Sequence, residues 1–225
     1  FWSNGIHLQQ IEAADSPADE SWANINAIDD LAEAIIRTDS QLTIAALQGN
    51  CGAGGCFLAR AADFVWARAG VLLNPHYRNM GNLYGSEYWT YLLPKRVGAA
   101  AAQAIMRNRL PMNVASGVAA GFLDACLAAD ADAFRIDVAR RAAELAAAPD
   151  LAVRLQAKRA ERLADEAAKP LASYRHAELV ELQRNFYGFD PSYHVARHHF
   201  VYKTPASWTP RHLAIHRDLG WKVPQ

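Results

Sequence analysis

The first third of the chain alternates between helical and strand patterns of apolar residues. Over residues 19–38 the apolar positions recur at steps of three, four and one among polar ones, which predicts an amphipathic helix. Residues 42–47 form a short apolar run that predicts a buried strand. Three glycines then precede the helix-permissive stretch 56–62, and strand character returns at 63–68 and 70–73. This order of strand, glycine turn, helix and strand is typical of an α/β layer.

The rest of the chain has mainly helical patterns. After the polar and aromatic stretch 76–85, Ser86 is expected to cap a helix that carries Glu87 in its first turn. Alanine and other helix formers dominate later, with breaks at Pro111, Gly121 and residues 188–191, and at Pro149 and Pro170, which are typical of helix boundaries. We therefore expect an α/β core over residues 1–128 and a helical C-terminal region over residues 129–225.

Composition and charge narrow the classes of function. The 225 residues are 52% hydrophobic and 20% charged, which suits a globular protein with a buried core. Lysine plus arginine number 23, and aspartate plus glutamate also number 23, so no overall positive field favours nucleic acid or an anionic membrane. No uninterrupted apolar run approaches the roughly 18 residues of a membrane span. We expect a soluble protein with no nucleic-acid partner and no membrane partner.

The cysteines and the first residues bear on the compartment and on completeness. Cys51, Cys56 and Cys126 are an odd number without a paired framework, so a reducing, cytoplasmic setting is expected. The chain has no initial methionine and begins with Phe1 and Trp2, which suit the end of a buried strand better than a natural terminus. We expect a piece of a longer protein.

The glycine cluster at residues 49–55 is the first feature with chemical meaning. A glycine turn after a buried strand and before a helix leaves free backbone N–H groups that can bind an oxyanion or a phosphate. Its sequence, Gly-Asn-Cys-Gly-Ala-Gly-Gly, has neither the spacing of a dinucleotide site nor the Gly-Lys-Ser/Thr ending of a phosphate loop. From these residues alone, ligand binding and plain close packing of helix on strand both remain open.

Residues 45–59, which contain this cluster, resemble the strand, turn and helix of the enoyl-CoA hydratase/isomerase (crotonase) superfamily. Other segments agree in the same order, at residues 2–8, 92–98 and 114–124. Within the superfamily, the run 74–94 resembles most closely the C-terminal domain of hydrogenase-maturation proteins, and the likeness extends through residues 202–203 and 210–217. The resemblance implies an α/β fold with a crotonase-like (ClpP/crotonase) spiral core, N-terminally truncated by its first strands and helix, followed by a helical C-terminal region.

The resemblance also implies an oxyanion hole. By matching motif positions, its two backbone N–H groups belong to Ile6 and Gly54, and two such donors stabilise charge on a thioester carbonyl oxygen. The chain departs from the hydratases where they carry two glutamates, because Phe57 and His76 stand there instead, and His7 replaces a usual aspartate. Hydration of a double bond needs a pair of positioned carboxylates, so ordinary hydratase activity is not expected.

Glu87 is the candidate for the missing acid–base group. It stands near Tyr84, Ser86 and Tyr88, and aromatic surroundings can raise the pKa of a carboxyl group toward the range of a working base. The alternative is a glutamate that only favours the N-terminus of a helix dipole. We expect the three neighbouring residues and Phe57 to form the pocket around it.

Histidines supply the remaining candidates. His76 and Tyr77 follow a proline in a loop from which a proton donor can point inward, or they are hydrogen-bonding side chains only. Two pairs have the i, i+4 spacing that can hold a metal ion on one helical face: His194 with His198 and His212 with His216. Neither pair contains the Glu of the His-Glu-x-x-His motif and no cysteine is near, so we expect no metal site.

The function that the resemblance implies is carbon monoxide synthesis for [NiFe]-hydrogenase. In that scheme formyl-CoA is broken down here to CO and coenzyme A. The Ile6 and Gly54 N–H groups would bind the formyl oxygen, and Glu87, assisted by Tyr77 or His76, would move the formyl proton. Formyl-tetrahydrofolate would be used by an N-terminal formyltransferase-like domain of the same chain, which these residues do not contain. That domain and hydrogenase maturation proteins are the expected partners.

Two other functions remain open from the sequence. One is a conventional acyl-CoA hydratase or isomerase whose base is relocated to Glu87. The other is a non-catalytic docking module for hydrogenase assembly. An assay of CO released from formyl-CoA separates the first function from both.

Overall fold

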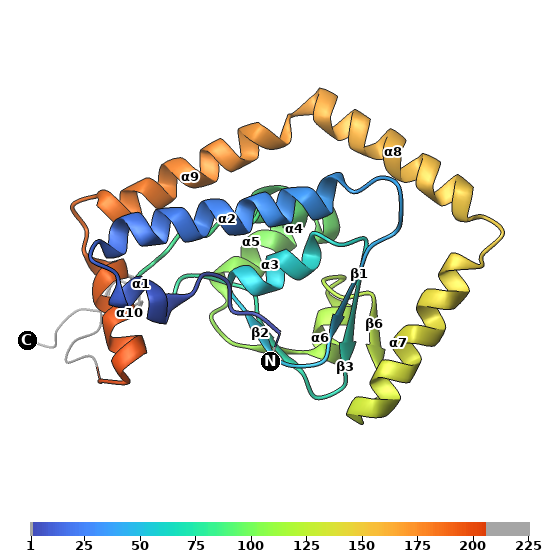
Figure 1. Cartoon of the computed structure of the whole chain (residues 1–225), viewed down its shortest axis with the longest axis horizontal. Coiled ribbons are helices and arrows are strands. Elements are labelled where there is room, and N and C mark those ends of the chain that lie inside the picture. The colour runs from blue at the N-terminus through green and yellow to red at the C-terminus, as the bar shows by residue number, and fades with distance from the viewer. Residues whose placement is uncertain (1, 206–225) are drawn as a thin grey trace, which may run out of the picture.

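The computed structural model describes residues 2–205 as two small sheets with helices packed around them (Figure 1). The helices are α1 (Leu8–Ala13), α2 (Pro17–Arg37), α3 (Gly54–Arg60), α4 (Trp89–Val97), α5 (Ala99–Arg107), α6 (Val114–Ala119), α7 (Ala131–Ala146), α8 (Leu151–Ala168), α9 (Leu171–Tyr187) and α10 (Ser192–Tyr202). The strands are β1 (Ile44–Leu47), β2 (Cys51–Gly52), β3 (Phe64–Arg68), β4 (Leu72–Asn74), β5 (Met112–Asn113) and β6 (Ala125–Leu127).

Both sheets have three strands within the described residues. In the first, β1, β3 and β6 are parallel, with Ala46 opposite Trp66 and Trp66 opposite Ala125. In the second, β2 pairs parallel with β4, and β4 pairs antiparallel with β5. Parallel strands need a crossover connection, and α3 lies in the crossover that leads from β1 and β2 to β3 and β4. The α/β class predicted from the alternating patterns is confirmed.

The apolar side chains of these strands and of the helices beside them form the main core. Leu47, Phe57, Val65, Leu73 and Leu93 are fully buried in it. Burying an apolar side chain of this size contributes about 1.5–3 kcal/mol relative to leaving it exposed. The glycine turn between β2 and α3 is therefore held on a packed base.

α2 is the amphipathic helix predicted over residues 19–38. The Ser16 hydroxyl accepts the N–H of the third helical residue at 3.4 Å, and Pro17 occupies the first helical position, where its missing N–H costs nothing. The buried face carries Ile25, Asp29 and Ile36, which follow the helical spacing. A carboxylate on this face is unusual, because aspartate is rarely buried without a partner.

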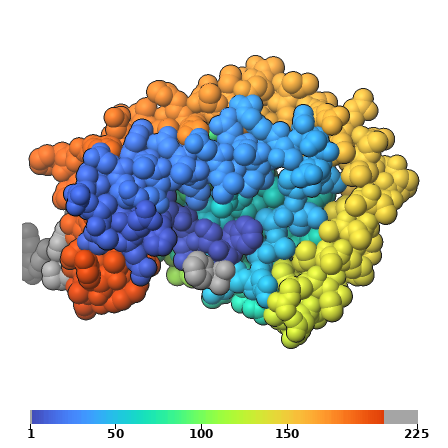
Figure 2. All heavy atoms as spheres, viewed as in Figure 1, coloured from blue at the N-terminus to red at the C-terminus, as the bar shows by residue number. Residues whose placement is uncertain are grey.

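The helices after the last strand wrap around the core. α9 packs along α2 and α4, and α10 packs on α1. In Figure 1 and in the space-filling view of Figure 2, α7, α8 and α9 form the right-hand and upper edges of the molecule.

As predicted, Pro149 lies between α7 and α8, and Pro170 lies between α8 and α9. The division between residues 128 and 129 stays a prediction. Over residues 2–205, no helix has both the length and the apolar character needed to cross a membrane.

The helix after Ser86 begins later than the sequence predicts. α4 starts at Trp89, and the two residues before it, Glu87 and Tyr88, have left-handed backbones with φ of 58° and 59°. The Ser86 hydroxyl lies 2.7 Å from both carboxylate oxygens of Asp29 and is not free to cap a helix. The expectation that Ser86 caps this helix is therefore wrong, and Glu87 lies in the turn before α4 rather than within it.

Candidate active site

One cleft of about 980 Å³ opens beside the glycine turn. Its walls come from residues 2–9, the glycine turn, the loop that follows β4 and the C-terminal end of α10. All five candidate catalytic and oxyanion-hole residues line it: Ile6, Gly54, His76, Tyr77 and Glu87. The structure thus brings together three stretches that are far apart in the chain.

The N-terminal segment lies against the glycine turn through backbone hydrogen bonds. The N–H of Trp2 donates to the carbonyl of Asn50 at 2.8 Å, and the N–H of Gly52 donates to the carbonyl of Ser3 at 3.1 Å. These bonds bring Ile6 to the start of α3, where the first N–H groups have no partner inside the helix. Neither the Ile6 nor the Gly54 N–H donates to any atom of the described chain. Both are available to a ligand oxygen, as an oxyanion hole requires.

The close approach of the N-terminal segment and of the Glu87 carboxyl group to the glycine turn explains why residues 5 and 54 are glycines. A Cβ added to Gly54 would lie 1.9 Å from Oε1 of Glu87, so no side chain fits there without moving the carboxyl group. Gly5 has a φ of +86°, and a Cβ on it would lie 3.2 Å from the Gly54 nitrogen. Only glycine combines this backbone angle with this spacing at low cost. The Glu87 carboxyl group therefore lies directly beside the candidate oxyanion donors.

Glu87 is buried and its carboxyl group is hydrogen-bonded to the Tyr77 hydroxyl. The Tyr77 hydroxyl lies 2.5 Å from Glu87 Oε2 and 3.0 Å from the Ser86 carbonyl oxygen. One hydroxyl proton can be donated to only one of these oxygens, so both contacts are hydrogen bonds only when Glu87 carries a proton and donates it to Tyr77. Burial, followed by the negative charge of Asp29, raises the pKa of Glu87 to about 8. The hydrogen-bond count and the electrostatics both favour a neutral Glu87 at neutral pH.

His76 lines the cleft as a buried side chain without a hydrogen bond of its own. It is 3% exposed, and neither ring nitrogen has a hydrogen-bond partner among the described residues. Burial lowers the pKa of His76, and the Arg109 carbonyl nearby opposes this effect without reaching hydrogen-bond geometry. A neutral imidazole in the cleft can accept one hydrogen bond from a ligand and donate another.

The four residues expected to form the pocket lie behind the cleft lining. Phe57 is fully buried and stacks on the Tyr77 ring at a centroid distance of 5.5 Å. The Tyr88 hydroxyl donates to Glu33 at 2.8 Å, on the side of α2, and the Tyr84 ring packs on Trp89. Ser86 is fully buried and turned toward Asp29. None of these four residues lines the cleft: Phe57, Tyr84, Ser86 and Tyr88.

Two buried carboxyl groups, Asp29 on α2 and Glu178 on α9, were missed by the sequence reasoning. Both are fully buried, and both lie at the turn that carries Glu87. A signal for Asp29 was present in the sequence, because it occupies a core position of the amphipathic pattern between Ile25 and Ile36. A carboxylate at such a position indicates a specific partner.

The described residues contain no group of three or more His, Cys, Asp or Glu side chains that could hold a metal ion. His194 contacts the Phe186 carbonyl oxygen at 2.8 Å, and His198 contacts Glu12 at 2.7 Å. Both members of this pair are therefore engaged in the contact of α10 with its neighbours. The second pair, His212 and His216, lies outside the described residues.

Replacing Glu87 by Gln is expected to change how stability depends on pH. The pKa of Glu87 is raised in the folded state. The contribution of Glu87 to the free energy of unfolding is therefore fully present below its ordinary pKa of 4.5 and is lost as pH rises toward about 8. Glutamine does not titrate, so the melting temperature of Glu87→Gln minus that of the unmodified protein should become more positive as pH rises from about 5 to about 8.5.

Thermal melts of both proteins over this range test that prediction. Glu144→Gln, on the exposed surface of α7, is the matched control and should keep a constant difference. A Glu87→Gln difference that is equally constant would show that the Glu87 carboxyl group is not held neutral in the folded protein.

Comparisons with known proteins cover nearly the whole chain. The family model described as enoyl-CoA hydratase/isomerase matches residues 1–211. The hydrogenase maturation factor HoxX of Bradyrhizobium diazoefficiens is 57% identical over 217 residues, which are 96% of this chain and 38% of that protein. The chain therefore spans about two-fifths of the length of this relative.

Solved structures agree with the family match. HypX from Aquifex aeolicus, solved in complex with tetrahydrofolic acid, superposes with a TM-score of 0.89 at 47% identity, over 99% of this chain and 40% of that one. An enoyl-CoA hydratase from Bacillus halodurans, at 15% identity, has a TM-score of 0.70 over 85% of this chain and 74% of that one, which shows the fold alone. The crotonase fold and the similarity to hydrogenase-maturation proteins are both confirmed. Because the family model and these folds cover almost all of the described residues, the chain belongs to the enoyl-CoA hydratase/isomerase family.

Proposed function

We propose that this chain releases CO from formyl-CoA, as the C-terminal part of a [NiFe]-hydrogenase maturation factor. The observation that carries the proposal is the placement of the buried Glu87 carboxyl group, whose pKa is raised to about 8, beside the Gly54 N–H. Among the described residues that line the cleft, Glu87 is the single carboxyl group. The site therefore offers two oxyanion donors and one proton carrier.

The cleft suits a coenzyme A thioester. Its volume of about 980 Å³ is at the upper end of the range for small-molecule sites. Lys203, at the end of α10, lines the cleft and supplies a positive charge for a phosphate of coenzyme A. The thioester end of the ligand would then reach Gly54 and Glu87.

The proposed reaction moves one proton from carbon to sulfur within the same substrate. The Ile6 and Gly54 N–H groups hold the formyl oxygen, and the ionised form of Glu87 accepts the formyl proton. The C–S bond breaks with its electron pair on sulfur, which leaves CO, and Glu87 returns the proton to the thiolate. Formyl-CoA becomes CO and coenzyme A with no other reactant. A pKa of about 8 suits both transfers, because the carboxyl group can lose and regain a proton near neutral pH.

The wider setting of the reaction follows from the relatives. HypX has been solved with tetrahydrofolic acid, and this chain covers 40% of the HypX chain. We place a formyltransferase-like domain that uses formyl-tetrahydrofolate in the remaining part of the full-length protein. Its product would be formyl-CoA, and the partners would be hydrogenase maturation proteins. The unpaired cysteines of the sequence suit a cytoplasmic setting for this chemistry.

Glu87→Gln in the full-length protein is expected to lower CO release from formyl-CoA about a hundredfold or more, because glutamine keeps the size but cannot carry the proton. Single-turnover CO release and a thermal melt at about pH 6 measure activity and folding separately. Glu144→Gln serves again as the control. Near-normal CO release by a folded Glu87→Gln protein would move the proton transfer to Tyr77 or His76.

Gly54→Ala is expected to reduce CO release by about tenfold or more, because the added methyl group would displace the Glu87 carboxyl and crowd the oxyanion donor. Gly52→Ala is the matched control in the same turn, since its Cβ would meet the Asn4 side chain at 3.1 Å and the Cβ of Asn74 at 3.8 Å and would not approach Glu87. Circular dichroism establishes that both variants are folded. Equal CO release by the two folded variants would contradict the oxyanion assignment of Gly54.

Crotonyl-CoA is expected to be a poor substrate. Phe57 is fully buried against Tyr77 and His76 is an imidazole, so neither supplies the carboxylate that hydratases carry at these positions. Loss of the double-bond absorbance of crotonyl-CoA measures hydration directly. Hydration at the rate of an ordinary enoyl-CoA hydratase would instead favour a conventional hydratase with its base at Glu87.

A further inference from the structure

The turn that carries Glu87 is strained and is held from two helices. Glu87 and Tyr88 are consecutive residues with side chains in the left-handed region, a conformation that costs free energy for each. The N–H of Glu87 donates to Asp29 Oδ1 at 2.8 Å, and the N–H of Tyr88 donates to Glu178 Oε2 at 3.0 Å. One carboxyl group from α2 and one from α9 thus fix this backbone.

The contacts of Ser86 require a proton on one of the two carboxyl groups. Its hydroxyl lies 2.7 Å from Asp29 Oδ1 and 3.2 Å from Glu178 Oε2. One hydroxyl proton can serve only one acceptor, so the second contact needs a proton on a carboxyl group. Burial raises the pKa of Glu178 to about 8, against the opposing effect of the hydrogen bonds that Glu178 accepts from the N–H and the hydroxyl of Thr90. Burial raises the pKa of Asp29 only to about 6, so Asp29 is the anion at neutral pH.

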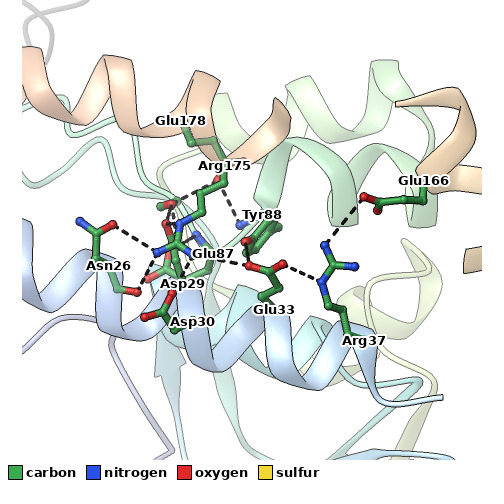
Figure 3. A network of polar contacts seen from close by, with 11 residues as sticks. Asn26, Asp29, Asp30, Glu33, Arg37, Glu87, Tyr88, Glu166, Arg175 and Glu178 are labelled. Carbon is green, nitrogen blue, oxygen red and sulfur yellow. Dashed lines mark hydrogen bonds and ion pairs between the residues drawn. The ribbon is translucent and has the colours of Figure 1, made fainter. Parts of the chain in front are cut away.

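The surroundings of Asp29 support this assignment. Arg175 Nε, on α9, lies 3.9 Å from Asp29 Oδ2, which favours the charged form of Asp29. In Figure 3, Arg175 reaches from α9 toward Asp29, Asp30 and Asn26 on α2. Asp29 is itself fully buried, so its charge is weakly screened and acts strongly on neighbouring groups.

We infer that Asp29 is a positioning residue for Glu87, which fixes the turn through the Glu87 N–H and whose buried negative charge keeps the proton on the Glu87 carboxyl group. The consequence for catalysis rests on the proposed function, in which Glu87 moves the proton. The effect on the Glu87 carboxyl group itself does not depend on the reaction.

Other charged or titratable groups also face this region and enter the same titration. They are Asp30 and Glu33 from α2, Arg175 and Glu178 from α9, Tyr77 and Tyr88 from the loop before α4, and Cys56 from α3. Among the charged neighbours of Glu87, Asp29 makes the largest contribution to its raised pKa. Glu178 raises the pKa of Glu87 by a smaller amount, so the predicted effect is largest for Asp29.

Asp29→Asn in the full-length protein is the direct test. The amide oxygen of asparagine can still accept the Glu87 N–H, and its amide N–H can donate to Ser86, so the variant removes charge and keeps the contacts. We expect the pKa of Glu87 to fall by about one or more, as for loss of a nearby like charge. Asp30→Asn removes the same charge from the next residue, whose side chain is 69% exposed, and should leave the pKa of Glu87 nearly unchanged.

Infrared spectroscopy of protein labelled with 13C in its aspartate or glutamate carboxyl groups reads this titration without substrate. The Glu87 band is identified by its absence from Glu87→Gln. A folded Asp29→Asn protein with an unchanged Glu87 titration would overturn the inference. Since no substrate is present, this outcome is separate from a failure to release CO, which concerns the proposed function alone.

The reciprocal measurement covers the case in which Asp29→Asn does not fold. In the unmodified protein Glu87 still carries its proton where Asp29 loses its own, so the Asp29 carboxyl group in Glu87→Gln should titrate at nearly the same pH as in the unmodified protein. A clear shift of the Asp29 titration to lower pH in Glu87→Gln would show that Glu87 ionises before Asp29 and would overturn the inference. Where CO release is measured, Asp29→Asn should move the acid side of the kcat/KM profile to lower pH by the same amount. A purely structural role would lower activity equally at every pH.

Discussion

The burial of carboxyl groups around the Ser86 hydroxyl is the constraint on which the site depends. Asp29 and Glu178 satisfy the backbone N–H groups of a strained turn, and that turn carries Glu87 to Gly54. If α2 or α9 moved away, these groups would be left buried without partners, at a cost well above that of an ordinary surface contact. The packing of the two helices and the geometry of the cleft therefore depend on the same contacts.

The parts of the site that the sequence predicts are those that a short stretch of neighbouring residues determines. The glycine turn, Ile6 and the Tyr77 loop each belong to a short continuous motif, and the strand and helix periods around them are clear. Pro149 and Pro170 likewise mark helix boundaries, because proline lacks the backbone N–H that the interior of a helix uses. Such features depend on a few neighbouring residues and can be predicted without knowledge of the rest of the fold.

The parts that the sequence does not predict depend on distant residues. Ser86 looks like a helix cap, yet its hydroxyl meets Asp29, which lies 57 residues earlier, and Glu178, which lies 92 residues later. Those contacts override the local preference and delay the start of α4 to Trp89. Asp29 could have been noticed as a carboxylate at a core position, but its partners on the turn and on α9 have no pattern in the sequence that connects them.

One proton carrier in place of two carboxylates is a consistent arrangement for the proposed reaction. Hydration must activate a water molecule and also protonate carbon, whereas loss of CO moves a single proton from carbon to sulfur. Water near a formyl thioester would give formate instead of CO, so an apolar wall is an advantage. Phe57, at the position where hydratases carry a carboxylate, is stacked on Tyr77 behind the cleft lining, so this position supplies no group that would hold water in the cleft. The same substitution that argues against a hydratase is therefore consistent with a site in which Glu87 moves the proton without a second carboxylate.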